Sequence, residues 1–224
     1  MKAALVYTST TPELMEWVET EVRKQLGGEV ELLSYQNGEI LAKTREAGYV
    51  TAEAAAELAK LFMTAIQDGA DAILNICSSV GEAADAMQDF ADYSGVPIVR
   101  IDQEMCREAV RLGSRIAIMA TLPTTLQPTK NTVMRMARSM GRVVTPVEVL
   151  VDGAFGLNPE EFRMRMLEKA GEVAAQVDVI LLCQGSMAYC EQLLADTYHK
   201  PVLSSPRFGA AALKKALQDK GLIK

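Results

Sequence analysis

Two stretches of the chain each run from an aspartate through a short apolar segment to a cysteine, and these cysteines are the residues best suited to chemistry. The first stretch runs from Asp71 to Cys77, and the second runs from Asp178 to Cys183. A short polar turn and a helical pattern follow each cysteine. The repetition indicates a duplication in which Cys77 and Cys183 are equivalent and face each other across one small-molecule site.

A cysteine that follows a buried strand and precedes a helix is a candidate acid or base. The helix dipole and the free backbone N–H groups at such a position lower the thiol pKa and make the thiolate available. We expect this effect at Cys77 and Cys183. The alternative is a cysteine that packs as a small apolar side chain. We prefer that alternative for Cys106 and Cys190, which lie inside predicted helices.

Hydroxyl, amide and glycine residues lie near both cysteines and at the ends of other predicted strands. They favour a small anionic substrate, because hydroxyls, an amide and backbone N–H groups can hold one without a side-chain cation. The alternative for each residue is helix capping, a common role of Ser and Thr at such turns. The substrate-binding candidates are Ser9, Asn75, Ser78, Ser79, Thr121, Thr124, Gln184, Gly185 and Ser186.

The composition excludes several classes of function. A net charge of −6 and a pI near 5.0 argue against nucleic acid or an anionic membrane as a partner. The single histidine, His199, is not spaced with any cysteine pair, so no metal site is expected. No glycine-rich nucleotide motif, membrane-spanning segment or signal peptide is recognisable. We therefore expect a cytoplasmic protein with a small-molecule substrate.

Strand and helix patterns alternate along the whole chain and predict an α/β fold with a parallel sheet in each half. The polar segment 35–49 is predicted to be a functional loop or lid. The predicted strands are 2–8, 30–34, 71–77, 96–101, 115–120, 142–150, 178–183 and 201–204. The predicted helices are 13–26, 51–68, 82–93, 102–112, 126–140, 159–176, 187–198 and 206–220.

We predict two pseudo-symmetric parallel-sheet α/β domains, one formed by residues 1–98 plus 206–224 and the other by residues 99–205. Ligands of open α/β sheets bind at the carboxyl ends of the strands. Those strand ends carry the candidate residues in both halves. The active-site cleft is therefore expected between the two domains.

Three segments together resemble the aspartate/glutamate/hydantoin racemase superfamily: Asn75-Ile-Cys77-Ser78-Ser79, Ala120-Thr121 and Leu182-Cys183-Gln184-Gly185-Ser186-Met187. The resemblance covers nearly the whole chain. It implies a reaction without a cofactor, in which one thiolate removes a Cα proton and the opposite thiol supplies one. Proteins that resemble this chain are commonly dimers or larger, so a homo-oligomer is an expected form.

The predicted function is a racemase or epimerase of a small amino acid, hydantoin or related carboxylate, with Cys77 and Cys183 as the acid/base pair. Ser9 and Gly185 stand where similar amino-acid racemases often carry Asp and His. This departure favours a hydantoin-like or other substrate over a free amino acid such as glutamate. Two alternatives stay open. One is a one-cysteine relative, such as a maleate-type cis–trans isomerase or a malonate decarboxylase, and the other is a non-catalytic ligand-binding protein.

Overall fold

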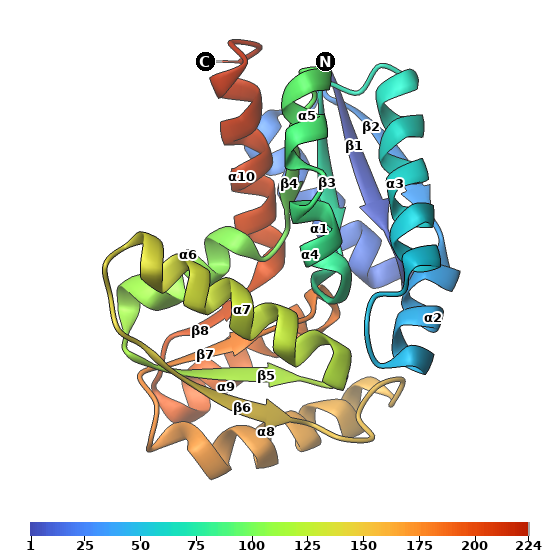
Figure 1. Ribbon diagram of the computed structural model, residues 1–224. Coiled ribbons are helices and arrows are strands. Elements are labelled where there is room, and N and C mark those ends of the chain that lie inside the picture. Colours follow the sequence, from blue (N-terminus) through green and yellow to red (C-terminus); the bar gives the residue numbers. More distant parts are fainter. Residues whose placement is uncertain (224) are drawn as a thin grey trace. The chain divides into compact units, whose positions relative to one another are not determined.

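The computed structural model describes residues Met1–Ile223, which form two compact units (Figure 1). The first unit contains Met1–Ile101 and the C-terminal segment that starts at Pro206, and the second contains Asp102–Ser205. Each unit has a four-stranded parallel sheet with flanking helices. The predicted α/β class with one parallel sheet in each half is confirmed.

The first unit has the strand order β2-β1-β3-β4. Its strands are β1 (Lys2–Tyr7), β2 (Glu31–Gln36), β3 (Ala72–Ile76) and β4 (Ile98–Arg100). Its helices are α1 (Pro12–Leu26), α2 (Gly38–Ala47), α3 (Ala52–Gln67), the short 3-10 helix η1 (Ser78–Val80), α4 (Gly81–Asp85), α5 (Gln88–Ser94) and α10 (Ser205–Asp219).

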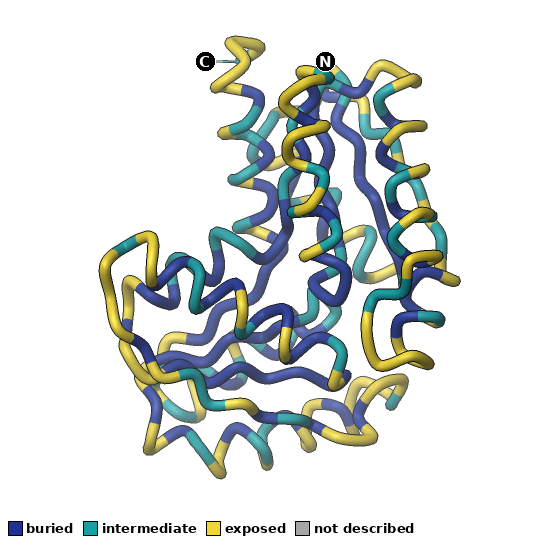
Figure 2. The backbone as a smooth tube through the Cα atoms, viewed as in Figure 1, coloured by how far each residue is buried: buried dark blue, intermediate teal, exposed yellow. Residues whose placement is uncertain are grey.

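The first sheet is covered on both faces, and its two central strands are buried (Figure 2). Leu74 points to the face where Val18 of α1 and Leu213 of α10 pack. Neighbouring residues of a strand point to opposite faces, so Ile73, directly before Leu74, packs on the other face with Phe62 of α3. Burial on both faces explains why β1 and β3 consist of nearly continuous apolar residues.

The segment predicted as a loop or lid contains helix α2, so that prediction is wrong. Asn37 begins the helix, because its side-chain oxygen accepts a hydrogen bond from Glu39 N at 3.1 Å. Gly48 ends the helix in the left-handed conformation. Ile40 is fully buried, and the buried Thr44 hydroxyl donates to Ile40 O at 2.8 Å. The helix packs on the core and also contacts η1.

The second unit has the strand order β6-β5-β7-β8. Its strands are β5 (Arg115–Ala120), β6 (Thr145–Leu150), β7 (Val179–Leu182) and β8 (Val202–Ser204). Its helices are α6 (Gln103–Leu112), α7 (Pro123–Ser139), α8 (Pro159–Ala174), the 3-10 helix η2 (Gly185–Cys190) and α9 (Glu191–Tyr198). Helix α7 begins at Pro123, three positions before the predicted start, because proline is well suited to the first turn of a helix.

An aspartate joins the starts of the two central strands in each unit. Asp71 Oδ2 accepts from Lys2 N at 2.8 Å, at the beginning of β1. In the second unit Asp178 Oδ2 accepts from Arg115 N and Ser114 N, both at 2.8 Å. The two repeated stretches therefore begin with residues that fix strand alignment.

Candidate functional site

The alignment of strands inside each sheet shows which residues of the two units are equivalent. Ala72 of β3 pairs with Ala3 of β1, as Val179 of β7 pairs with Ile116 of β5. Three positions further along, Asn75 pairs with Val6, and Leu182 pairs with Met119. The two sheets thus keep the same register from the aspartates to the ends of these strands.

Counting forward from this shared register makes Gln184 the counterpart of Cys77 and makes Ile76 the counterpart of Cys183. The flanking helices agree, because η1 begins directly after Cys77 and η2 begins directly after Gln184. Both residues hold an extended backbone conformation at the start of a 3-10 helix. The predicted equivalence of the two cysteines is therefore wrong, because the second stretch has one residue fewer between its aspartate and its cysteine.

Burial follows the register and not the residue type. Cys183 has 0% of its surface exposed and Ile76 has 5%, whereas Cys77 and Gln184 are both partly exposed. Successive residues of an extended chain point to opposite faces. The side chains of Cys77 and Cys183 therefore occupy different positions in their respective units.

In the first unit, polar atoms without partners surround the end of β3. Asn75 donates through Nδ2 to Cys77 O at 3.1 Å, and its Oδ1 is buried with no hydrogen-bond partner among the described residues. Ser78 Oγ, in the turn after Cys77, and Thr8 Oγ1, directly after β1, are also buried without a partner in the described chain. A buried polar atom without a partner is unfavourable unless a ligand or water supplies one.

Two further candidates of the first unit lie in the same turns. Ser79 is buried inside η1, and Ser9 is partly exposed after Thr8. The neighbouring Thr10 hydroxyl is 3.4 Å from Gln36 Oε1. The structure thus places every first-unit candidate at the carboxyl ends of the adjacent strands β1 and β3.

Cys183 lies in an environment that opposes ionisation. Burial raises the pKa of the Cys183 thiol, and the Asp102 carboxylate raises it further, whereas the Thr129 hydroxyl lowers it. The thiol is 3.9 Å from Leu181 O. The expected lowering of the Cys183 pKa is therefore wrong, because loss of hydration outweighs any effect of the short helix that follows.

In the second unit, Thr121 and Gln184 form a compact hydrogen-bonded pair across the ends of β5 and β7. Gln184 Oε1 accepts from Thr121 N at 2.7 Å. The Thr121 hydroxyl is 2.9 Å from Gln184 Nε2 and 3.1 Å from Oε1. Near the start of α7, Thr124 Oγ1 is buried without a partner among the described residues. Gly185 and Ser186 are partly exposed in η2.

Arg100 is a residue near the site that the sequence interpretation did not single out. It ends β4 beside Asn75, and its guanidinium contacts Asp85 Oδ2 at 2.6 Å with only 2% of the side chain exposed. Gly81, three residues beyond Ser78, leaves space for the guanidinium, because a Cβ there would lie 2.4 Å from Arg100 Cζ. An arginine inside an apolar strand was the sequence signal that could have identified it.

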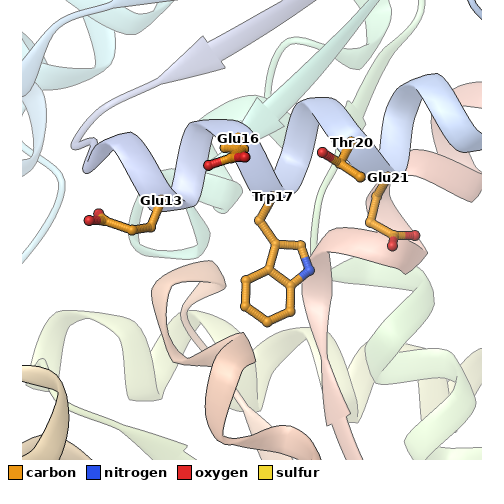
Figure 3. Close-up of a pocket in the computed structure, with 5 residues that line it drawn as sticks. All are labelled: Glu13, Glu16, Trp17, Thr20 and Glu21. Carbon is orange, nitrogen blue, oxygen red and sulfur yellow. The ribbon is translucent and has the colours of Figure 1, made fainter.

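Helix α1 carries a further surface feature. A surface pocket on α1 is lined by Glu13, Glu16, Trp17, Thr20 and Glu21, and the Trp17 ring extends away from the helix (Figure 3). None of the predicted site residues lines it. Among residues Met1–Ile223, no three His, Cys, Asp or Glu side chains come together as a metal site requires. Over the same residues, every helix is too short or too polar to cross a membrane.

Comparison with known proteins identifies the family. The model of the family Asp/Glu/Hydantoin racemase matches residues 4–213. The chain belongs to this family. None of the curated protein sequences compared with it matches.

Solved structures of racemases share the fold of this family member. A glutamate racemase from Bacillus anthracis superposes with a TM-score of 0.76 at 14% identity, over 98% of this chain and 82% of that chain. An allantoin racemase from Klebsiella pneumoniae gives a TM-score of 0.68 at 16% identity, over 99% and 89%. An unliganded arylmalonate decarboxylase gives 0.60 at 13% identity, over 96% and 92%. The same architecture is therefore found with more than one reaction.

Proposed function

We propose that this protein is a cofactor-independent enzyme of the racemase/epimerase class that moves the proton on a carbon next to a carboxylate or a cyclic-amide carbonyl. Cys77 is one acid/base group for this proton transfer. The substrate is a small carboxylate, amino acid or hydantoin-like ring.

One observation carries the proposal. Cys77 is a partly exposed thiol at the end of a buried central strand. Among the described residues, the buried atoms Asn75 Oδ1 in the same strand, and Ser78 Oγ and Thr8 Oγ1 directly after the strands, have no hydrogen-bond partner. A thiol has a pKa of roughly 8.5 in water. It can therefore accept and return a proton near neutral pH, as a general acid/base must. The polar atoms are suited to substrate groups that donate hydrogen bonds, and the two hydroxyls can also donate.

Inversion of a stereocentre needs a second acid or base on the opposite face of the substrate. Cys183 is the residue that the sequence predicted for this role, and a racemase with two thiols would require it. The solved structures named above include racemases of glutamate and allantoin. These names support the reaction class as a starting point for substrate screening.

The complete burial of Cys183 and its raised pKa favour a second candidate, a reaction that uses one thiol. Protonation of a carbanion left by loss of CO2 is such a reaction, because it needs a proton on one face only. The arylmalonate decarboxylase that shares this fold is named for a reaction of that kind.

Proton exchange in D2O tests the proposal. The probes are single enantiomers of allantoin, glutamate, aspartate and 5-benzylhydantoin, with phenylmalonate for decarboxylation. We expect deuterium to enter at the carbon next to the carbonyl of at least one probe, as followed by NMR. Cys77→Ser should abolish the reaction, while Cys106→Ser, a buried thiol in α6, serves as the matched control. Reaction that persists in Cys77→Ser, or no reaction with any probe, would contradict the proposal.

A further inference from the structure

We infer that Asn75 determines specificity in the first unit, because its side-chain oxygen accepts a hydrogen bond from a neutral N–H group attached to the reacting carbon of the substrate. This inference rests on the proposed function, since it concerns the same proton transfer. The substrate class that it selects is an N-acylated amino acid or a cyclic ureide. It disfavours a free amino acid and an arylmalonate.

The placement of Asn75 beside Cys77 is the first step. Ile73 belongs to the core cluster on one face of the first sheet, and Cys77 packs against that cluster. Leu74 and Ile76 belong to the cluster on the other face. Strand residues two positions apart point to the same face, so Asn75 shares its face with Cys77 at a distance of about 7 Å along the chain.

The hydrogen bond of Asn75 fixes the orientation of its amide. Nδ2 donates to Cys77 O at 3.1 Å, and the nitrogen must be the atom on this side because a carbonyl oxygen only accepts. Oδ1 therefore lies on the other side of the amide. Asn75 is only 1% exposed, and no group of the described residues donates to Oδ1. A buried acceptor in this state needs a donor from a ligand or from water.

Two hydroxyls lie near the same strand ends. The last pair between β1 and β3 joins Tyr7 to Ile76, so Thr8 and Cys77 follow side by side. Thr8 Oγ1 and Ser78 Oγ are buried and have no partner in the described chain. A hydroxyl can either donate or accept, whereas an amide oxygen can only accept. The amide oxygen is thus the one of these three groups that requires a donor from the substrate.

The spacing is suited to a donor on the atom next to the reacting carbon. A thiolate approaches the reacting group to about 3.5 Å. A C–N bond measures about 1.5 Å, and an N–H···O hydrogen bond measures about 2.9 Å between its heavy atoms. These lengths together reach about 8 Å, enough for the roughly 7 Å between the Asn75 and Cys77 positions. A carboxylate in place of this N–H would set a second acceptor against Oδ1.

The charges near Asn75 favour a neutral N–H over an ammonium group. Residues 7–10 and 75–81 contain no charged side chain. Arg100 is the neighbour of Asn75 in β4, and its guanidinium contacts Asp85 Oδ2 at 2.6 Å. The Asp85 carboxylate is therefore already paired with a cation. An ammonium group at Oδ1 would lose hydration without gaining an opposite charge from these residues.

Proton exchange of two matched rings in D2O tests the hydrogen bond. One probe is 3-methyl-5-benzylhydantoin, whose only N–H is at N1, beside the reacting C5. The other is 3-methyl-5-benzyloxazolidine-2,4-dione, in which a ring oxygen replaces this N–H. Relative to the rates in buffer, wild type should exchange the C5 proton of the hydantoin about 10–100-fold faster than that of the oxygen ring.

Variants show whether Asn75 causes this preference. Asn75→Leu should abolish it, because the acceptor is gone. Ser94→Ala is the matched control and should retain the preference, since it removes a hydroxyl that donates to Ala91 O in α5. General damage to the protein lowers the rates of both rings and leaves their ratio unchanged.

Phenylalanine and N-acetylphenylalanine test the charge on the nitrogen. Wild type should exchange the Cα proton of N-acetylphenylalanine faster than that of phenylalanine. Asn75→Asp, which places a carboxylate at the same position, should shift the preference toward phenylalanine. A wild-type preference for phenylalanine, or the same preference in wild type and Asn75→Asp, would contradict the selection of a neutral N–H.

The outcomes separate this inference from the proposed function. Equal rates for the two rings, a ratio that Asn75→Leu leaves unchanged, or exchange confined to glutamate, aspartate or phenylmalonate would overturn the inference and leave the proposed function in place. Absence of exchange with every probe would overturn the proposed function. Binding then decides the inference, because the hydantoin should raise the melting temperature of wild type more than that of Asn75→Leu. No shift with any probe would mean that Oδ1 binds only water, and would overturn the inference as well.

Discussion

Replacing Gly81 by alanine tests whether the buried Arg100–Asp85 pair supports the segment that follows Cys77. A Cβ at position 81 would lie 2.4 Å from Cζ and from Nη2 of Arg100. Only 2% of the Arg100 side chain is exposed, and the guanidinium contacts Asp85 Oδ2 at 2.6 Å. The guanidinium therefore has to move away from Asp85, or the chain at residue 81 has to move.

Two known costs set the size of the effect. Forcing extra atoms into a packed core costs about 1–3 kcal/mol. Removing one partner of a buried ion pair costs about 3–5 kcal/mol. The Asp85 side chain is 22% exposed, so water offsets part of the second cost. We expect Gly81→Ala to lower the free energy of unfolding by about 2–4 kcal/mol.

Urea denaturation followed by circular dichroism measures this change, with Gly38→Ala as the matched control. A Cβ added at Gly38 would have no atom within 4 Å, and the residue has no positive φ, so its replacement should change stability by at most about 1 kcal/mol. In an Arg100→Met background the cost of Gly81→Ala should fall to less than half, because the clashing guanidinium is gone. A cost for Gly81→Ala that matches the Gly38 control, or that is the same in both backgrounds, would refute the reasoning.

Three further predictions concern the strand anchor, helix α2 and the buried thiol. The backbone N–H groups of Arg115 and Ser114 hold the pKa of Asp178 below its usual range. The ionised Asp178 side chain therefore stabilises the fold fully above the unfolded pKa of about 3.9, and this stabilisation is lost as the pH falls through the folded pKa. Thermal melts should show Asp178→Asn less stable than wild type at pH 7 and the two converging in acid; a constant difference would contradict this. Asn37→Ala should lower the stability of helix α2 by about 1 kcal/mol, because it removes the capping side chain, whereas Asn37→Asp should retain stability. Hydrogen exchange of the α2 backbone amides measures both variants. Equal exchange rates in the two variants would argue against the cap. Because burial raises the pKa of Cys183, its alkylation in Cys77→Ser should stay slow well above pH 8.5; a midpoint near that pH would mean that water reaches the thiol.

The central strands of the two sheets could be predicted from the sequence because they are buried and apolar. The runs that begin at Asp71 and Asp178 each lead into a strand with both faces covered, and helical spacing separates them. The same burial made the register of these strands impossible to predict from the sequence. A strand that is apolar on both faces has no alternation of polar and apolar residues, so a one-residue difference leaves no trace in the pattern.

Helix α2 was missed for a different reason. Asn37-Gly38 is a common turn signal, and the polar residues that follow suggested a loop. In the structure the same Asn37 begins a helix, since tertiary burial of Ile40 and Leu41 outweighs the weak local preference. A hydrogen bond from a capping side chain is decided by backbone geometry, which residue types alone do not specify.

The side chains at equivalent positions of the two units differ in their hydrogen bonds. In the first unit, Asn75 Oδ1 and Ser78 Oγ near Cys77 are buried without partners among the described residues. In the second unit the counterpart of Cys77 is Gln184, and its side-chain orientation is fixed because Oε1 accepts a hydrogen bond from Thr121 N. A group that must change protonation needs surroundings that tolerate two charge states, whereas a group that only donates a hydrogen bond benefits from a fixed orientation. The duplicated framework thus places unlike side chains at like positions, a thiol at Cys77 in the first unit and an amide bonded to Thr121 at Gln184 in the second.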